Sequence, residues 1–205
     1  MNRRSPNLPK MRSLKGPALR TGALGCMLLL LAGCGAPPLS TFDLSAPTSG
    51  VKARSARGVL VIPEPTAPAP ADGDRIVVRT GPSAVAVIKG AQWTERLPRL
   101  LQSRLIQTFE NAKLLRSVSR PGDGVTPDRA LAWDVRRFEM DAATGEAVVD
   151  ISVKVLDSSG RVLGGQIFTA QAPGDASQGE TASLALDAAS NDVLRQIVAW
   201  ASARV

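Results

Sequence analysis

Histidine and tyrosine are both absent from the 205 residues of this sequence, and aromatic residues make up only 3% of it. Without histidine, the chain cannot build a Ser-His-Asp triad, a Cys-His dyad or a histidine-ligated zinc site. Its 2 cysteines, Cys26 and Cys34, are too few for a disulfide framework or a four-cysteine metal site. These absences exclude several large classes of enzymes and metalloproteins.

Acidic residues are missing from residues 1–33, which hold six lysines and arginines. The rest of the chain carries 19 basic and 18 acidic residues, so the formal net charge of +7 belongs almost wholly to the N-terminal segment. Because this positive charge lies in the N-terminal segment, it does not indicate a nucleic-acid-binding surface on the rest of the chain. We therefore expect no nucleic-acid partner.

A hydrophobic run of membrane-spanning length is missing too. The uncharged apolar stretch at residues 21–33 has only 13 residues, whereas a spanning helix needs about 20. A basic segment, a short apolar run and small residues at its end are typical of a secretory signal. The alternative, a buried core helix, gives no reason for the clustered positive charge before it.

The apolar run ends in Leu31-Ala32-Gly33-Cys34, which resembles a bacterial lipobox. The resemblance implies cleavage between Gly33 and Cys34, a thioether-linked lipid on Cys34, and acylation of its new amino group, for example by palmitate. Each buried methylene contributes ~0.8 kcal/mol, so three acyl chains make an effectively permanent anchor. The alternative is that Cys34 is an ordinary small residue of a leader.

The residue after the cysteine is Gly35, not the aspartate that favours inner-membrane retention in enteric bacteria. The motif therefore implies a lipid anchor on the periplasmic face of the outer membrane. The chain divides into a lipoprotein signal peptide (1–33), a lipidated tether (34–40) and a periplasmic domain (41–205). The 172 residues that follow cleavage have the size of one ordinary domain.

Two hydrophobic periods predict the elements of this domain. A helix is expected to begin between Thr94 and Leu97, because Pro98 is tolerated only in a first turn. Ser177 and Glu180 have the spacing of a capping box for a second helix. Gly164-Gly165 indicates a bulge or a close approach within the last strand. Strands are expected over 41–44, 58–62, 74–79, 84–89, 114–119, 131–138, 149–155 and 161–170, and helical spacing runs through 93–112 and 186–200.

The order of these elements predicts an α+β two-layer sandwich, with a mostly antiparallel sheet and two amphipathic helices. In the strand at 131–138, the period-2 pattern places Arg137 on the same face as the apolar residues Leu131, Trp133 and Val135. The three tryptophans, Trp93, Trp133 and Trp200, are expected in the core, with a lipid or partner surface as the alternative.

Catalytic machinery is scarce in this sequence. No GxSxG, SxxK or phosphate-cradling glycine loop is present, and we expect no metal and no cofactor. Four acids in the long-strand region could be paired carboxylates for glycoside chemistry, although a solvated sheet face is the simpler interpretation. These are Asp134, Glu139, Asp141 and Asp150. Similarly, Arg96, Arg99 and Arg104 indicate a solvated helix surface more than a phosphate-binding one.

An ordered set of motifs resembles the ABC-type transport auxiliary lipoprotein component family. The motifs follow Cys34 and its short tether, and they cover nearly all of the domain. They are Thr41-Phe42-Asp43-Leu44, Val61-Ile62-Pro63, Asp74-Arg75-Ile76-Val77-Val78-Arg79, the segment from Ala91-Gln92-Trp93 to Leu101, Trp133 to Phe138, and the hairpin at 157–160.

The resemblance implies a non-enzymatic, lipid-anchored periplasmic subunit. It would work with an ABC ATPase, a permease and a mammalian-cell-entry (MCE) domain protein that move lipids between the inner and outer membranes and support envelope integrity. Exposed sheet edges or the region 74–89 are the expected docking surfaces, and self-association into a homo-oligomer stays open. Two alternatives are a stand-alone lipoprotein that binds a lipid or solute between sheet and helices, and an outer-membrane barrel assembly lipoprotein.

Overall fold

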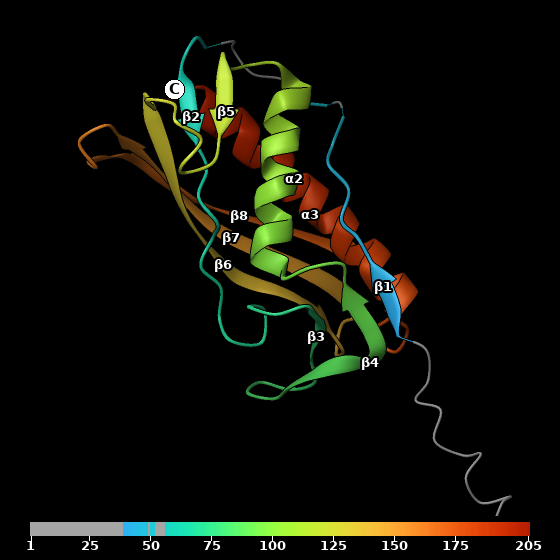
Figure 1. The fold of residues 1–205 in the computed structure, drawn as a ribbon. Helices are drawn as coiled ribbons and strands as arrows, with labels where there is room; N and C mark the ends of the chain where they lie inside the picture. Colours follow the sequence, from blue (N-terminus) through green and yellow to red (C-terminus); the bar gives the residue numbers. More distant parts are fainter. Residues whose placement is uncertain (1–38, 49, 52–55) are drawn as a thin grey trace, which may run out of the picture. The chain divides into compact units, whose positions relative to one another are not determined.

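The computed structural model describes residues 39–48, 50–51 and 56–205 (Figure 1). Within these ranges, strands precede the first helix, a longer run of strands follows it, and a second helix ends the chain, in the predicted order. The elements are β1 (Ser40–Phe42), β2 (Val59–Val61), β3 (Arg75–Arg79), β4 (Val85–Trp93), α2 (Leu97–Ala112), β5 (Ser117–Ser119), β6 (Arg129–Asp141), β7 (Glu146–Asp157), β8 (Val162–Pro173) and α3 (Gly179–Ser202).

The long strand β6 lies at the centre of the sheet. On one side it pairs antiparallel with β7, which pairs antiparallel with β8. On the other side it pairs parallel with two shorter strands, β2 near its start and β3 near its end. β5 continues from β2, while β4 and then β1 continue from β3. The described sheet therefore ends in the short strands β1 and β5 on one side and the long strand β8 on the other (Figure 1).

Both helices pack on the same face of this mixed sheet, which confirms the predicted α+β two-layer architecture. One hydrophobic core joins both helices to alternate residues of the strands, such as Ile151, Val153 and Val155 of β7. Buried residues of the opposite face, such as Val77 and Val148, lie outside that core. We call the helix-packed side the covered face and the other side the open face.

Period-2 alternation explains how β7 is divided between the two faces. Ile151, Val153 and Val155 are fully buried, whereas Lys154 is exposed and Ser152 is half-buried. Burying one such aliphatic side chain contributes ~1.5–3 kcal/mol. The covered face therefore carries most of the hydrophobic driving force of this fold.

The predicted helix start is right for α2, but the predicted side-chain cap of α3 is wrong. α2 begins at Leu97, with Pro98 in its first turn, but Trp93 belongs to the end of β4 and not to a helix. No side chain caps the start of α3. The Ser177 hydroxyl instead donates to the Asp175 carboxylate at 2.7 Å, because that acid is two residues away in a tight turn. The capping-box prediction therefore fails.

A bulge in β6 overturns the predicted orientation of Arg137. The register with β7 shifts between Val135 and Arg137, and this shift reverses the alternation that follows. Phe138 and Met140 consequently take the covered face, while Arg137 joins Glu139 on the open face, where the two side chains form a hydrogen bond.

Candidate functional site

The predicted lipidation site Cys34 and the other lipobox residues, Leu31, Ala32 and Gly33, lie outside the described residues. The description begins at Leu39, which is 46% exposed and directly precedes β1. Among the residues from 39 onward that the structure describes, no helix is long and apolar enough to cross a bilayer. β1 is therefore the described element nearest in sequence to the predicted anchor.

The four carboxylates singled out from the sequence lie on β6 and β7 (Figure 1). Asp134 accepts a hydrogen bond from the Thr66 hydroxyl, and Asp141 lies 3.7 Å from Arg137. Asp150 lies 4.0 Å from Arg136. Asp134 and Asp150 each have a partner of their own, whereas Asp141 shares Arg137 with Glu139, and these contacts fit structural hydrogen bonds and ion pairs better than an acid and base pair. In the part of the chain that is described, no cluster of acidic or cysteine side chains could hold a metal ion.

Glu139 is the most enclosed of these acids and lies at the centre of a charged cluster. Arg79 donates from Nε at 2.7 Å and from Nη2 at 3.0 Å, and Arg137 donates from Nε at 2.8 Å. Burial raises the pKa of Glu139, but hydrogen bonds from Arg79 and Arg137 outweigh it, so this pKa lies below its ordinary value. Glu139 is therefore a fixed anion at neutral pH and is unsuited to donate a proton.

The Arg79–Glu139 pair also joins β3 to β6 beside an apolar surface. Val85 and Val87 of the neighbouring strand β4 are each 45% exposed on the open face. This area lies in the region 74–89 that the sequence offers as a docking surface. The structure thus places exposed apolar side chains next to a rigid charged cluster there.

The arginines of α2 do not form a free cationic surface. Arg96 bridges Glu64 at 2.9 Å and Asp72 at 2.5 Å, and hydrogen bonding to Asp72 is the main reason that the pKa of Arg96 is raised. Arg99 pairs with Glu95 of the preceding turn, and Arg104 binds both oxygens of Asp43. This pairing favours a solvated helix surface over a phosphate site.

The tryptophans lie mainly in the core, as expected. Trp93 and Trp133 are almost fully buried, and the Trp133 indole donates to the carbonyl of Pro63 at 2.8 Å. Trp200 is half-buried near the end of α3, where it meets Phe168 edge-on and Arg204 stacks on it at 4.2 Å. Only Trp200 therefore contributes to the surface.

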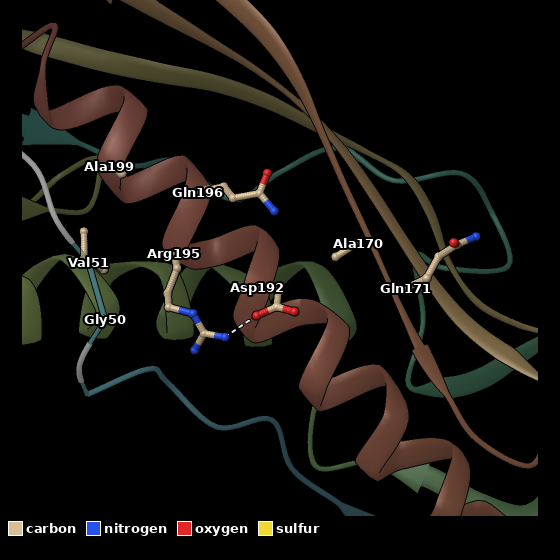
Figure 2. Close-up of a pocket in the computed structure, with 8 residues that line it drawn as sticks. All are labelled: Gly50, Val51, Ala170, Gln171, Asp192, Arg195, Gln196 and Ala199. Carbon is tan, nitrogen blue, oxygen red and sulfur yellow. Dashed lines mark hydrogen bonds and ion pairs between the residues drawn. The ribbon is translucent and has the colours of Figure 1, made fainter.

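Two hollows lie between α3 and the edge strand β8, and neither was predicted from the sequence. The first, of about 570 Å³, is bounded by α3, β8 and residues 50–51. Figure 2 shows Asp192 and Arg195 on the α3 side of this hollow, joined by an ion pair, with Ala170 and Gln171 on the strand opposite. The lining of this pocket therefore includes an ion pair with no net charge, together with small side chains and amide side chains.

The second hollow, of about 470 Å³, is more apolar and lies nearer the start of α3. Ala172 and Pro173 of β8 form one wall, and Leu184, Ala185 and Ala188 of α3 form the other. Leu184 is 63% exposed. This exposure could have been predicted from helical spacing. Leu184 lies two residues before the buried Leu186, so the two side chains point to different sides of the helix.

Comparisons with known proteins match nearly the whole described domain. Residues 41–198 match the family model described as ABC-type transport auxiliary lipoprotein component. A relative from Bradyrhizobium diazoefficiens, named uncharacterized protein bll6063, is 32% identical over 195 residues, which is 90% of this chain and 52% of the relative. The chain therefore spans about half the length of that curated relative.

Solved structures share the fold. The crystal structure of XCC0632 from Xanthomonas campestris, assigned to the family model DUF330, superposes with a TM-score of 0.72 at 25% identity, covering 80% of this chain and 95% of that one. A second crystal structure, described as an uncharacterized protein, gives a TM-score of 0.58 at 16% identity, with 82% and 96% of the two chains covered. The second likeness concerns the fold alone.

Proposed function

Since the chain belongs to the family of ABC-type transport auxiliary lipoprotein components, we propose that it is a non-enzymatic subunit of an ABC transport system, anchored by a lipid on Cys34. Its partner is an MCE-domain protein that works with the permease and the ATPase. The system moves lipids between the inner and outer membranes and supports envelope integrity. This subunit acts at the periplasmic face of the outer membrane.

The family match over residues 41–198 carries the proposal, because it runs from β1 almost to the end of α3. The domain that defines the family therefore covers nearly all of the described residues. A cytoplasmic ATPase supplies the energy of such a system, so this subunit needs no catalytic group of its own. The acidic side chains of the open face agree with a non-catalytic role, because hydrogen bonds from Arg79 and Arg137 keep Glu139 ionised.

A lipid on Cys34 would keep the domain close to the bilayer. Four residues lie between Cys34 and Leu39, and an extended chain over the five Cα–Cα steps from one to the other spans at most ~18 Å. The start of β1 would therefore stay near the membrane surface. Confinement to that surface raises the effective concentration of the domain for a partner in the same envelope.

The alternative of a lipid held between sheet and helices has less support. Fully buried side chains from both layers meet there, including Leu101 and Leu105 of α2, Ile151 of β7 and Leu194 of α3. The two hollows lie between α3 and the edge strand β8, at the margin of the two layers, and none of these fully buried side chains lines them. A docking role through the surface is therefore favoured over a lipid-carrying core.

Cross-linking in intact cells of the native host tests the proposal. The MCE-domain protein, the permease and the ATPase should be recovered together with the wild-type chain. Replacing Val87 by aspartate should reduce that recovery, because the side chain is exposed on the proposed docking region and is not needed in the core. Val125→Asp, the same change at an exposed valine in the loop between β5 and β6, is the matched control. Recovery of a barrel protein in place of the MCE protein would contradict the proposal.

The anchor is tested separately by metabolic labelling with palmitate. The wild-type chain should be labelled and should fractionate with outer membranes. Cys34→Ala should lose the label and accumulate as an uncleaved precursor. Continued labelling of this variant, or an unacylated mature wild-type chain in the mass spectrum, would overturn the proposed anchor.

A further inference from the structure

The described domain begins beside the start of α3. Ser40, the first residue of β1, lines a small hollow together with Gly179, the first residue of α3. The ring of Phe42 lies 3.1 Å from the position that a Cβ on Gly179 would take, so β1 runs directly past the first turn of α3 (Figure 1). The proposed lipid anchor, at most ~18 Å of chain away from Leu39, would therefore hold this end of the domain nearest to the bilayer.

Hydrogen bonds attach the chain after β1 to the same helix. Ser45 donates to the Asp187 carboxylate from its main-chain nitrogen at 2.6 Å and from its hydroxyl at 2.7 Å. The Asn191 amide donates to that hydroxyl at 2.7 Å. β1 itself pairs with β4 of the sheet. The segment that follows the proposed tether is thus held to both layers, and the first turns of α3 keep a fixed position beside it.

Those first turns carry the most exposed of the large apolar side chains in the described residues. Leu184 is 63% exposed and lies five residues after Gly179, which is ~7.5 Å along the helix axis. It lines two mainly apolar hollows: the second hollow, which β8 bounds, and a third of about 350 Å³, which it shares with Phe42 and Leu44. We call Leu184 and these two hollows the tether-side patch. A lone exposed leucine is ordinary, but a leucine that joins two apolar hollows marks an interaction surface.

The charged side chains around the tether-side patch are acidic. Asp175 lines the second hollow, and Glu180 and Asp187 line the third. Among the described residues that line these two hollows there is no lysine or arginine. Basic side chains attract anionic lipids, and this rim supplies none. A membrane contact here would therefore depend on apolar burial and would favour zwitterionic lipids such as phosphatidylethanolamine.

We propose that the tether-side patch rests on the bilayer that holds the anchor, with the Leu184 side chain inserted between zwitterionic phospholipids. This proposal depends on the proposed lipid on Cys34, because that anchor brings the bilayer within reach of the patch. A single leucine binds a membrane weakly by itself, but the anchor makes the contact effectively intramolecular. The contact restricts rotation of the domain about its tether, so the region 74–89 is presented to a partner in a fixed direction.

Quenching of a fluorescent label by lipids tests this contact. The acylated chain is reconstituted into vesicles of phosphatidylethanolamine and phosphatidylcholine, and flotation of the vesicles first establishes that it is anchored. Cys26 would be removed with the leader and the Cys34 thiol would be blocked by its lipid, so one introduced cysteine takes a bimane label. Lipids with a nitroxide on the acyl chain should quench a label at Ala188→Cys, beside Leu184, at least about threefold more than one at Val125→Cys.

The Val125 position is remote from the tether-side patch. It lies in the loop between β5 and β6, and β6 begins at Arg129, whose guanidinium contacts the carbonyl of Arg204 just past the end of α3. Val125 is 43% exposed, so a label there tolerates the same solvent contact. Equal quenching of the labels at Ala188→Cys and Val125→Cys would overturn the proposal.

A substitution of Leu184 separates insertion from mere proximity. Leu184→Asp should reduce the quenching of the Ala188→Cys label to the level of the Val125→Cys label, because a carboxylate does not enter the acyl region. Val125→Asp makes the same type of change at an exposed aliphatic residue and should leave that quenching unchanged. Circular dichroism establishes that each variant is folded, and Leu184→Ser replaces Leu184→Asp if the latter is not. Quenching that survives both Leu184 variants would contradict the proposal.

Lipid composition and salt identify the kind of contact. Replacing phosphatidylcholine by anionic phosphatidylglycerol should not increase the quenching, and 0.5 M NaCl should not abolish it, because the contact is apolar. A contact that requires anionic lipid or disappears in salt would refute apolar insertion. So would cross-linking of the patch to a protein without quenching by lipid. A wild-type chain that does not float overturns the anchor and this proposal together, whereas one that floats without quenching at Ala188→Cys overturns this proposal alone.

Discussion

The two faces of the sheet are stabilised by different interactions. On the covered face, aliphatic side chains of β7 such as Ile151 and Val153 are fully buried against the helices. On the open face, Glu139 and its two arginines form hydrogen bonds and ion pairs, and nearby valines stay half in solvent. The covered face therefore supplies most of the hydrophobic stabilisation, and the open face relies on polar contacts around Glu139.

This contrast follows from the physical chemistry of burial. Removing a buried aliphatic group loses its transfer energy and leaves a cavity. Removing a member of a partly exposed ion pair loses less, because water solvates the remaining charge. Substitutions on the two faces should consequently differ in cost even within a single strand.

The largest effect is expected for Ile151→Ala on the covered side of β7. It should lower the free energy of unfolding by about 2–5 kcal/mol, because the side chain is fully buried. Lys154 on the same strand points to the open face, so Lys154→Ala should change the free energy of unfolding by less than about 0.5 kcal/mol. Urea denaturation measures both. Similar losses for the two variants would remove the distinction between the faces.

The next effect concerns the charged cluster of the open face. Glu139→Gln should cost about 1–3 kcal/mol, because the nearly buried carboxylate accepts hydrogen bonds from Arg79 and Arg137. Asp141→Asn is the control, since Asp141 lies 3.7 Å from Arg137 and is more exposed, and it should cost less than about 1 kcal/mol. An equal or larger loss for Asp141→Asn would show that Glu139 is not the centre of the cluster.

The same cluster predicts a pH dependence. The folded pKa of Glu139 is lowered, so its contribution to stability is complete above the unfolded value of 4.5 and is lost as pH falls through the folded value. The stability difference between wild type and Glu139→Gln should therefore be constant from pH 5 to 7 and shrink below about pH 4. A difference that grows on acidification would show that burial of Glu139 dominates over its arginines.

A related effect is expected at the turn between β7 and β8. The Ser159 hydroxyl and the Arg161 backbone donate to Asp157 and lower its pKa from 3.8 to about 2. Asp157→Asn should destabilise the domain at neutral pH, and the difference from wild type should vanish as pH falls toward 2. Thermal melts across this range measure it. A difference unchanged at pH 2 would mean that the charge of Asp157 is irrelevant to the turn.

The covered face was predictable from the sequence because alternation within one strand or helix encodes it. The spacing of Leu101, Leu105 and Phe109 in α2 and of alternate residues in β7 was enough to predict the layers. The bulge after Val135 was not predictable, since it depends on the pairing partner, and it moved Arg137 to the other face. The failed capping box has a local cause instead, because Asp175, two residues before Ser177, competed for its hydroxyl.

The open face was predicted only in part. The sequence singled out Glu139, Asp141 and Asp150, but their arginine partners could not be assigned, because Arg79 comes from β3, 60 residues away. The uncharged composition of β8 was visible in the sequence. The sequence does not show that β8 is an edge strand, because this depends on the order of strands in the sheet. Non-local strand pairing therefore made the contacts of the site harder to predict from the sequence than the fold.

The smallest effect is expected on the solvent side of α2, and it separates charge from burial as the cause of the contrast between the faces. Arg99 and Glu95 form an ion pair across one turn at 3.1 Å, with the arginine side chain 71% exposed. Arg99→Ala should cost no more than about 0.5 kcal/mol, and 0.5 M NaCl should reduce this difference further, because screening acts on exposed pairs. Glu139→Gln should keep most of its cost at that salt concentration, since its carboxylate is enclosed. If salt removed both differences equally, enclosure of Glu139 could not be the reason for its larger contribution.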